Sequence, residues 1–198
     1  LLDLDPTEGV LAPRRGMRTL EDRIAVRRAI IDITLLQAVT GLRITEARTM
    51  PWSHVAIDDG GVMRMTVTDS ISKTRRGRTV PVLDQRVAGH LQDRKQAVGG
   101  DLVVGAPLAP SSVWDQSNCT KQIRKFYIEL GGTLDIPLLN TARSHVWRTT
   151  LNNLYITLPM EQRAALFGHD TAVNSRYYTD ITDVTALVEA AKQRRQAE

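Results

Sequence analysis

The 198-residue sequence is long enough for one ordinary domain, and its composition, 42% hydrophobic and 24% charged, is typical of a folded soluble domain rather than a disordered chain. No apolar run approaches the roughly 18 residues that span a bilayer, the first residues lack a signal-peptide layout, and the single Cys119 excludes an internal disulfide. A net charge of +4 hints at an anionic partner without identifying nucleic acid.

The N-terminal part is expected to form a lead-in followed by a long helix. Residues 1–18 carry prolines and glycines without a period, so we predict an irregular lead-in or the end of a linker. Thr19 and Asp22 have the spacing of a helix N-cap with an acidic residue one turn on. Apolar residues at helical spacing then predict a largely buried helix that ends near Gly41, and a short helix follows over 44–50.

The residue pattern then changes to one that favours a small sheet. Segments 54–58, 62–68 and 78–83 are rich in β-branched residues and are separated by glycine-containing turns. We therefore predict three antiparallel strands with turns at Gly60-Gly61 and around Gly77.

Helical patterns return in the second half of the chain. They cover 84–97, 113–130, 143–157, 160–167, 171–178 and 182–194. A Gly-Gly-Thr run at 131–133 is expected to break the helical pattern. The simplest interpretation is an α+β fold: a mostly helical single domain over 19–198 with a small three-stranded antiparallel sheet.

Two pairs of polar residues are spaced three positions apart, so each pair shares a helical face. Arg43 and Glu46 lie in GLRITEA, and His145 and Arg148 lie in SHVWR. Taken alone, the first pair is explained as a surface ion pair and the second as scattered polar residues on a half-exposed helix.

Three further features complete a series along the chain. Lys73 lies in the basic turn SKTRRGR between the second and third strands. In LFGHD, Gly168 is predicted to end a helix, with His169 just beyond it. Tyr178, beside Tyr177 in RYYTD, follows nine residues after that histidine, and a tyrosine pair alone is more often packing than chemistry.

The order of these motifs resembles that of the tyrosine recombinases, which include the phage integrases. It runs G-L-R-x-x-E, a lysine in a basic hairpin, H-x-x-R, L-x-G-H and a tyrosine nine residues later, and MPWSHVAID is also similar to the family. Several separately spaced motifs in one order are a specific signal. The resemblance implies an integrase-like catalytic fold that cuts and rejoins DNA through a 3′-phosphotyrosyl bond.

The resemblance also implies a role for each matched residue. Arg43 and Arg148 match the two catalytic arginines, whose forked donors suit the oxygens of a phosphodiester transition state. His145 and His169 match the two histidines, and Tyr178 matches the nucleophile, with Tyr177 as its rival.

Two more positions are carried over from the family. Lys73 matches the hairpin lysine, which would protonate the leaving 5′ oxygen. The neighbouring arginines cannot easily replace it as an acid, because arginine effectively never gives up its proton. Glu46 matches the acidic residue that supports the site. Since the phosphotyrosyl bond keeps the energy of the broken linkage, neither a metal nor another cofactor is expected.

Two basic clusters are predicted to contact duplex DNA. The hairpin cluster consists of Lys73, Arg75, Arg76 and Arg78, and the helix cluster of Lys121, Arg124 and Lys125. For the helix cluster an ordinary solvated face is an equal alternative.

The sequence departs from the family at two places. Trp147 and Thr149 flank the second arginine where the family has Leu and His, and Asp180 stands where a histidine often follows the nucleophile. No catalytic position is lost, so we expect a divergent integrase of a phage or mobile element. A type IB topoisomerase and a non-catalytic DNA-binding remnant are the alternatives.

The resemblance finally implies partners and a setting. The full-length protein is expected to bind double-stranded DNA as a homotetramer in a bacterial or phage-infected cytoplasm, with an N-terminal DNA-binding domain that this piece, itself expected to be monomeric, lacks. The helix expected at 182–194 would dock on a neighbouring protomer or fold back on its own domain.

Overall fold

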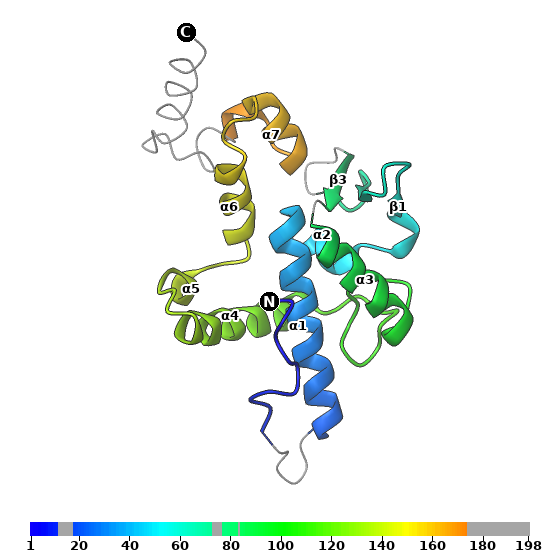
Figure 1. Cartoon of the computed structure of the whole chain (residues 1–198), viewed down its shortest axis with the longest axis vertical. Helices are drawn as coiled ribbons and strands as arrows, with labels where there is room; N and C mark the ends of the chain where they lie inside the picture. The colour runs from blue at the N-terminus through cyan, green and yellow to red at the C-terminus, as the bar shows by residue number, and fades with distance from the viewer. Residues whose placement is uncertain (12–17, 73–76, 83, 174–198) are drawn as a thin grey trace.

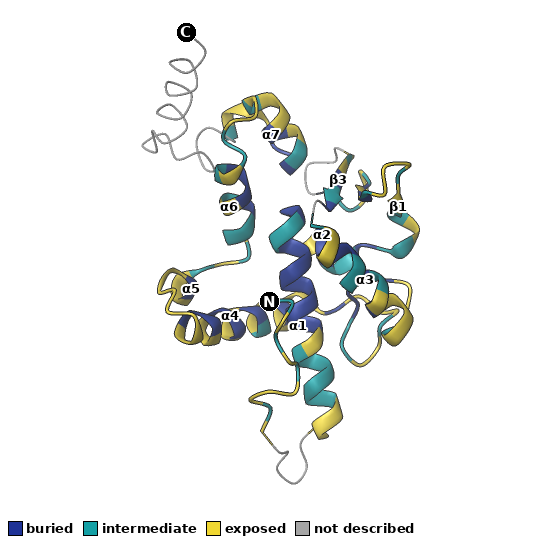
Figure 2. Ribbon diagram, in the orientation of Figure 1, coloured by how far each residue is buried: buried dark blue, intermediate teal, exposed yellow. Residues whose placement is uncertain are grey.

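The computed structural model describes residues 1–11, 18–72, 77–82 and 84–173, and its elements pack around one central helix, α1 (Leu20–Thr40) (Figure 1). At its start the Thr19 hydroxyl accepts from the Asp22 amide, and the Asp22 carboxylate accepts from the Thr19 amide, both at 3.1 Å. This arrangement confirms the predicted cap. The second half of α1 is buried (Figure 2), as expected of a helix that other elements surround.

The end of α1 shows why Gly41 is a glycine. Its φ of 64° lies in the left-handed region, which favours glycine at a helix end. A Cβ atom there would lie 2.6 Å from Cε1 of Phe167, the last residue of α7 (Met160–Phe167). Gly41 therefore both ends α1 and lets α7 approach it closely.

The sheet has the predicted three antiparallel strands. Its order is β1 (Val55–Ile57), β2 (Met63–Val67), β3 (Arg78–Val82), with Met65 of β2 opposite Val55 and Val80. Along β2 buried residues alternate with exposed ones, as in a sheet with one face on the core.

Four other helices match the expected ranges with shifted ends: α2 (Ile44–Thr49), α3 (Gln85–Val98), α4 (Gln116–Thr133) and α6 (Val146–Leu154). The 3₁₀ turn η1 (Trp52–His54) and the short helix α5 (Leu138–Thr141) were not predicted. Within the described ranges, no helix is long and apolar enough to cross a bilayer. The helix expected at 182–194, and 171–178 beyond residue 173, lie outside the described residues.

The predicted break at 131–133 is wrong, because α4 continues through both glycines to Thr133. Gly131 is buried against α5, and a Cβ atom there would lie 2.7 Å from Oδ1 of Asn140. The absence of a side chain thus serves the close packing of α4 on α5 rather than the end of a helix.

A buried polar group joins α1 to α3. Asp32 is 1% exposed, and its carboxylate accepts from Arg94 Nε at 2.6 Å and contacts His90 Nε2 at 2.8 Å. Arg94 also donates to the Val103 carbonyl at 2.7 Å. Leu1, Leu2 and Leu4 of the irregular N-terminal segment line a pocket beside this group.

This polar group predicts a pH dependence of stability. The hydrogen bond to Asp32 raises the pKa of His90 above its ordinary 6.5, although burial opposes the shift. A raised pKa in the folded state stabilises the fold fully below 6.5, and the gain is lost as pH rises through the folded-state pKa. The free energy of unfolding measured in urea should therefore fall as the pH rises from 6.5 through the folded-state pKa of His90. The fall should be smaller in His90→Gln. Parallel curves for the two proteins would contradict this linkage.

Candidate active site

A buried carboxylate at the start of α2 forms the centre of the site. Glu46 is fully buried, and its Oε2 accepts from the Arg43 backbone amide at 2.8 Å while its Oε1 accepts from Arg43 Nη1 at 3.0 Å. Arg43 is the N-cap residue of α2, which explains why the spacing of three brings the two side chains together. The pair is a partly buried one rather than the surface pair considered above.

Two further arginines donate to the same carboxylate. Arg78, at the start of β3, reaches Oε1 and Oε2 of Glu46 at 3.1 and 2.7 Å, and Arg148 of α6 reaches Oε2 at 3.3 Å. Burial alone would raise the pKa of Glu46, but the hydrogen bond from Arg78 and the charges of Arg78 and Arg148 hold it below its ordinary value. Glu46 is therefore ionised, and three guanidinium groups share one negative charge.

The same three arginines hold the end of α7. Arg78 Nε donates to the Leu166 carbonyl at 3.0 Å, Arg148 Nη1 donates to the Phe167 carbonyl, and Arg43 Nη2 donates to the Gly168 carbonyl at 3.2 Å. The last carbonyls of a helix lack partners within the helix and carry partial negative charge. Cations at these carbonyls therefore fix the end of α7 and the position of His169, which follows it.

His169 is held as a neutral imidazole against Arg148. Its Nε2 lies 3.0 Å from Arg148 Nη1, and since arginine only donates, Nε2 is the acceptor. Burial and the charges of Arg148, Arg43 and Arg78 lower the pKa of His169 to about 3. Near neutral pH this histidine accepts a hydrogen bond and carries no charge.

The structure thus brings together four of the residues matched by resemblance: Arg43, Glu46, Arg148 and His169. We call these four with Arg78 the arginine cluster. His145 is exposed and occupies the N-cap position of α6, one turn before the buried Arg148. Lys73, Arg75, Arg76, Tyr177 and Tyr178 lie outside the described residues.

Arg78 takes a position that the sequence did not indicate. It was expected with the DNA-contacting cations of the hairpin, yet its side chain is 7% exposed and its donors point at Glu46 and Leu166. Spacing along the chain gives no sign of this, because Arg78 and Glu46 are 32 residues apart.

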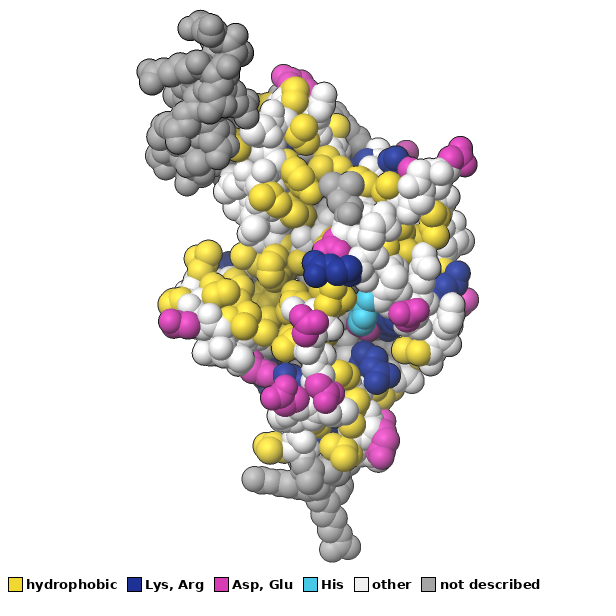
Figure 3. Space-filling view, viewed as in Figure 1, with side chains coloured by type: hydrophobic (Ala, Val, Ile, Leu, Met, Phe, Trp, Pro, Cys, Tyr) yellow, Lys and Arg dark blue, Asp and Glu magenta, His cyan; other side chains and the backbone are white. Residues whose placement is uncertain are grey.

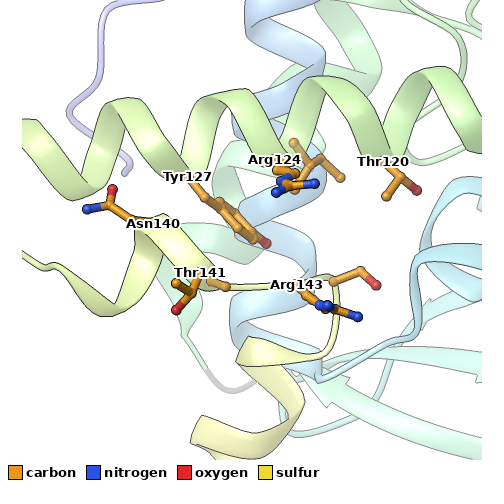
Figure 4. Close-up of a pocket in the computed structure, with 9 residues that line it drawn as sticks. Thr120, Arg124, Tyr127, Asn140, Thr141 and Arg143 are labelled. Carbon is orange, nitrogen blue, oxygen red and sulfur yellow. The ribbon is translucent and has the colours of Figure 1, made fainter.

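The helix cluster borders a polar pocket. Lys121, Arg124 and Lys125 are exposed on α4, and Arg124 lines a pocket of about 540 Å³ between α4 and the connection from α5 to α6. Arg143 enters the same pocket from that connection, just before His145 (Figure 4). Neither Arg124 nor Arg143 has an ion-pair partner among the described residues. Arg143 was not predicted, since it lies outside both basic clusters.

The described fold is similar to several solved recombinases. The XerH site-specific recombinase, in a post-cleavage complex with a palindromic difH substrate, aligns with a TM-score of 0.63 and 20% identity over 84% of this chain and 46% of that chain. The XerA recombinase aligns with 0.62 and 19% identity over 92% and 66%. A lambda integrase dimer bound to a COC′ core site aligns with 0.50 and 18% identity over 82% and 59%.

Neither a scan against protein-family models nor a search of curated proteins gives a match. The chain spans about half the length of the XerH chain. At sequence identities near 20%, the structural similarity establishes the fold alone. The described part of the chain has the α+β fold of the tyrosine recombinases, which confirms the integrase-like fold predicted from the order of its motifs.

Proposed function

We propose that this chain is the catalytic domain of a site-specific recombinase of a phage or mobile element. It cleaves duplex DNA through Tyr178 and rejoins it from a 3′-phosphotyrosyl intermediate. The observation that carries the proposal is the arginine cluster, in which three guanidinium groups face one carboxylate and a neutral histidine. Such a surplus of buried positive charge is stabilised by an anion, and a phosphodiester is an anion that suits forked donors.

Arg43 and Arg148 are proposed to bind the non-bridging oxygens of the scissile phosphate. A guanidinium has five N–H donors, and Arg43 directs one to Glu46 and one to Gly168, so that others remain for an incoming oxygen. Because protein atoms already fix both arginines, little reorganisation is needed as charge develops on the phosphate.

Proton transfer is then assigned to other residues. In the DNA-free chain, burial and the charges of the three arginines hold the pKa of His169 far below its ordinary value, so we assign His169 a hydrogen-bonding role. His145, one turn before Arg148, is the proposed proton acceptor. Lys73, five positions before the anchored Arg78, is the proposed acid for the leaving 5′ oxygen.

DNA on either side of the scissile phosphate is proposed to contact the pocket beside α4. Replacing Arg124 and Arg143 together with alanine should weaken binding to a random-sequence duplex. Since each phosphate contact adds about 0.9 to the slope of log affinity against log salt, the slope should fall by about two. Titrations at several salt concentrations measure it, with Arg86→Ala as the control because exposed Arg86 pairs with Asp84. An unchanged slope in the double variant would exclude phosphate contacts at this pocket.

The longer protein is proposed to assemble as a tetramer on two DNA sites. Apolar side chains gather over α5 and the end of α4 (Figure 3), where Leu134, Ile136 and Leu138 are exposed. An exposed apolar surface of this kind suits contact with a neighbouring protomer.

Two assays separate this function from its alternatives. A bound sequence is first selected from random duplexes, and plasmids with one or two copies of it are then incubated with the chain. A recombinase joins the paired sites, a type IB topoisomerase relaxes supercoiled plasmid irrespective of pairing, and a remnant binds without breaking DNA. Arg148→Ala is the inactive control. Binding without breakage or joining would contradict the proposed function.

A further inference from the structure

Arg78 directs its guanidinium entirely into the protein. Its two terminal nitrogens hold both oxygens of Glu46, and its Nε holds the Leu166 carbonyl. At 2.7 Å its contact with Oε2 is shorter than the 3.3 Å contact of Arg148 with the same atom. Arg78 thus holds Glu46 in a bidentate side-chain pair.

Arg78 also covers the residue that precedes His169. A Cβ atom on Gly168 would lie 2.9 Å from Arg78 Nη1 and 3.2 Å from its Cζ, so the guanidinium lies directly against that backbone. Gly168 has a φ of 64° and accepts from Arg43 Nη2 at its carbonyl. The segment that leads into His169 is therefore held between Arg78 and Arg43.

We propose that Arg78 is a positioning residue, rather than a DNA contact, for the strand cleavage proposed above. Through Glu46 it orients Arg43 and Arg148, and through Leu166 and Gly168 it orients His169. Because Arg78 begins β3, it also joins this strand to the arginine cluster.

The two possible roles of Arg78 differ in what they change. A DNA contact contributes to affinity and to its salt dependence, since it releases counterions. A positioning residue leaves both nearly unchanged and alters the rate of the chemical step, because the groups that stabilise the transition state are displaced.

The test compares Arg78→Ala and Arg78→Lys with Arg64→Ala. Arg64 is a suitable control because it lies on the adjacent strand β2, is exposed and pairs with Asp58 at 2.6 Å. Single-turnover formation of the covalent adduct on nicked DNA gives the rate, and salt titrations give the affinity and its slope. We expect Arg78→Ala to slow adduct formation on the order of a hundredfold. Arg78→Lys should recover part of the loss, and Arg64→Ala should react like the wild type.

A loss of affinity and salt slope at an unchanged rate in Arg78→Ala would overturn the proposal. So would a wild-type rate in that variant. If a urea-unfolding control shows that Arg78→Ala does not fold, Arg78→Lys becomes the variant that tests the proposal. It keeps the charge but loses the bidentate contact. A rate for Arg78→Lys equal to the wild-type rate would then reject the positioning role.

A second measurement needs no DNA. The NMR titration of His169 in the DNA-free chain should show a higher pKa in Arg78→Ala than in the wild type, and no change in Arg64→Ala. If the wild type forms no adduct, the proposed recombinase function fails. The titration still decides whether Arg78 controls the surroundings of His169, and equal pKa values in all proteins would contradict it.

Discussion

Arg148→Lys should slow covalent cleavage of DNA on the order of a hundredfold or more, a loss like that from removing one oxyanion donor. Arg148 is 1% exposed and joins the Phe167 carbonyl, His169 Nε2 and Glu46 Oε2 through its two terminal nitrogens. A lysine keeps the charge but has a single terminal nitrogen, so it does not reproduce the forked geometry. Arg43→Lys is expected to show a similar loss, because Arg43 also bridges Glu46 and the end of α7.

The measurement is a single-turnover cleavage rate at saturating DNA. Arg163→Lys is the matched control, because Arg163 is a buried arginine of α7 that donates to the Leu158 and Asn152 carbonyls outside the arginine cluster. Its rate should stay close to that of the wild type once both proteins are shown to be folded. Near wild-type cleavage by both Arg43→Lys and Arg148→Lys would rule out a guanidinium clamp.

Glu46→Ala should lower the free energy of unfolding by about 3–5 kcal/mol, the usual cost of leaving buried charges without their partner. Glu46 is the carboxylate that Arg43, Arg78 and Arg148 share, so its loss leaves three guanidinium groups facing one another. Repulsion among them also displaces the carbonyls of α7 that they hold. Cleavage should therefore fall together with stability.

Urea unfolding of the DNA-free chain measures the first effect. Glu129→Ala provides the control, because Glu129 pairs with Arg27 at 2.5 Å but is half exposed, and such pairs contribute about 1 kcal/mol or less. A loss below about 1 kcal/mol in Glu46→Ala, similar to that in the control, would show that the carboxylate does not hold the cluster together.

The elements that the sequence predicted well are those with strong local signals. The capping pair Thr19 and Asp22, the glycine that ends α1 and the alternation along β2 each depend on residues close in the chain. The helix break predicted at Gly131 was wrong because this glycine serves tertiary packing. Without a side chain, it lets α5 pack closely against α4. The four-residue α5 carries too few positions for a periodic pattern.

The candidate site was predictable in part from the order of motifs spread along the chain. The motif order identified Arg43, Glu46, Arg148 and His169, and the fold brings these four together. Nothing in SKTRRGR indicated that Arg78 turns inward, and its place beside Glu46 depends on the packing of β3 with β2, α1 and α7. The low pKa of His169 arises from burial among three arginines that come from separate elements, so local sequence does not show it.

The most direct measurement is to map the covalent bond between protein and DNA. The chain is incubated with a nicked duplex carrying its selected sequence, the detergent-resistant complex is digested, and the linked peptide is identified by mass spectrometry. The expected product is a phosphodiester on Tyr178, present in the wild type and absent in Tyr178→Phe, which should still bind DNA because only a hydroxyl is lost. A phosphate on Tyr177, or an adduct that persists in Tyr178→Phe, would contradict the assignment of the nucleophile, and no adduct on any nicked substrate would contradict the proposed chemistry.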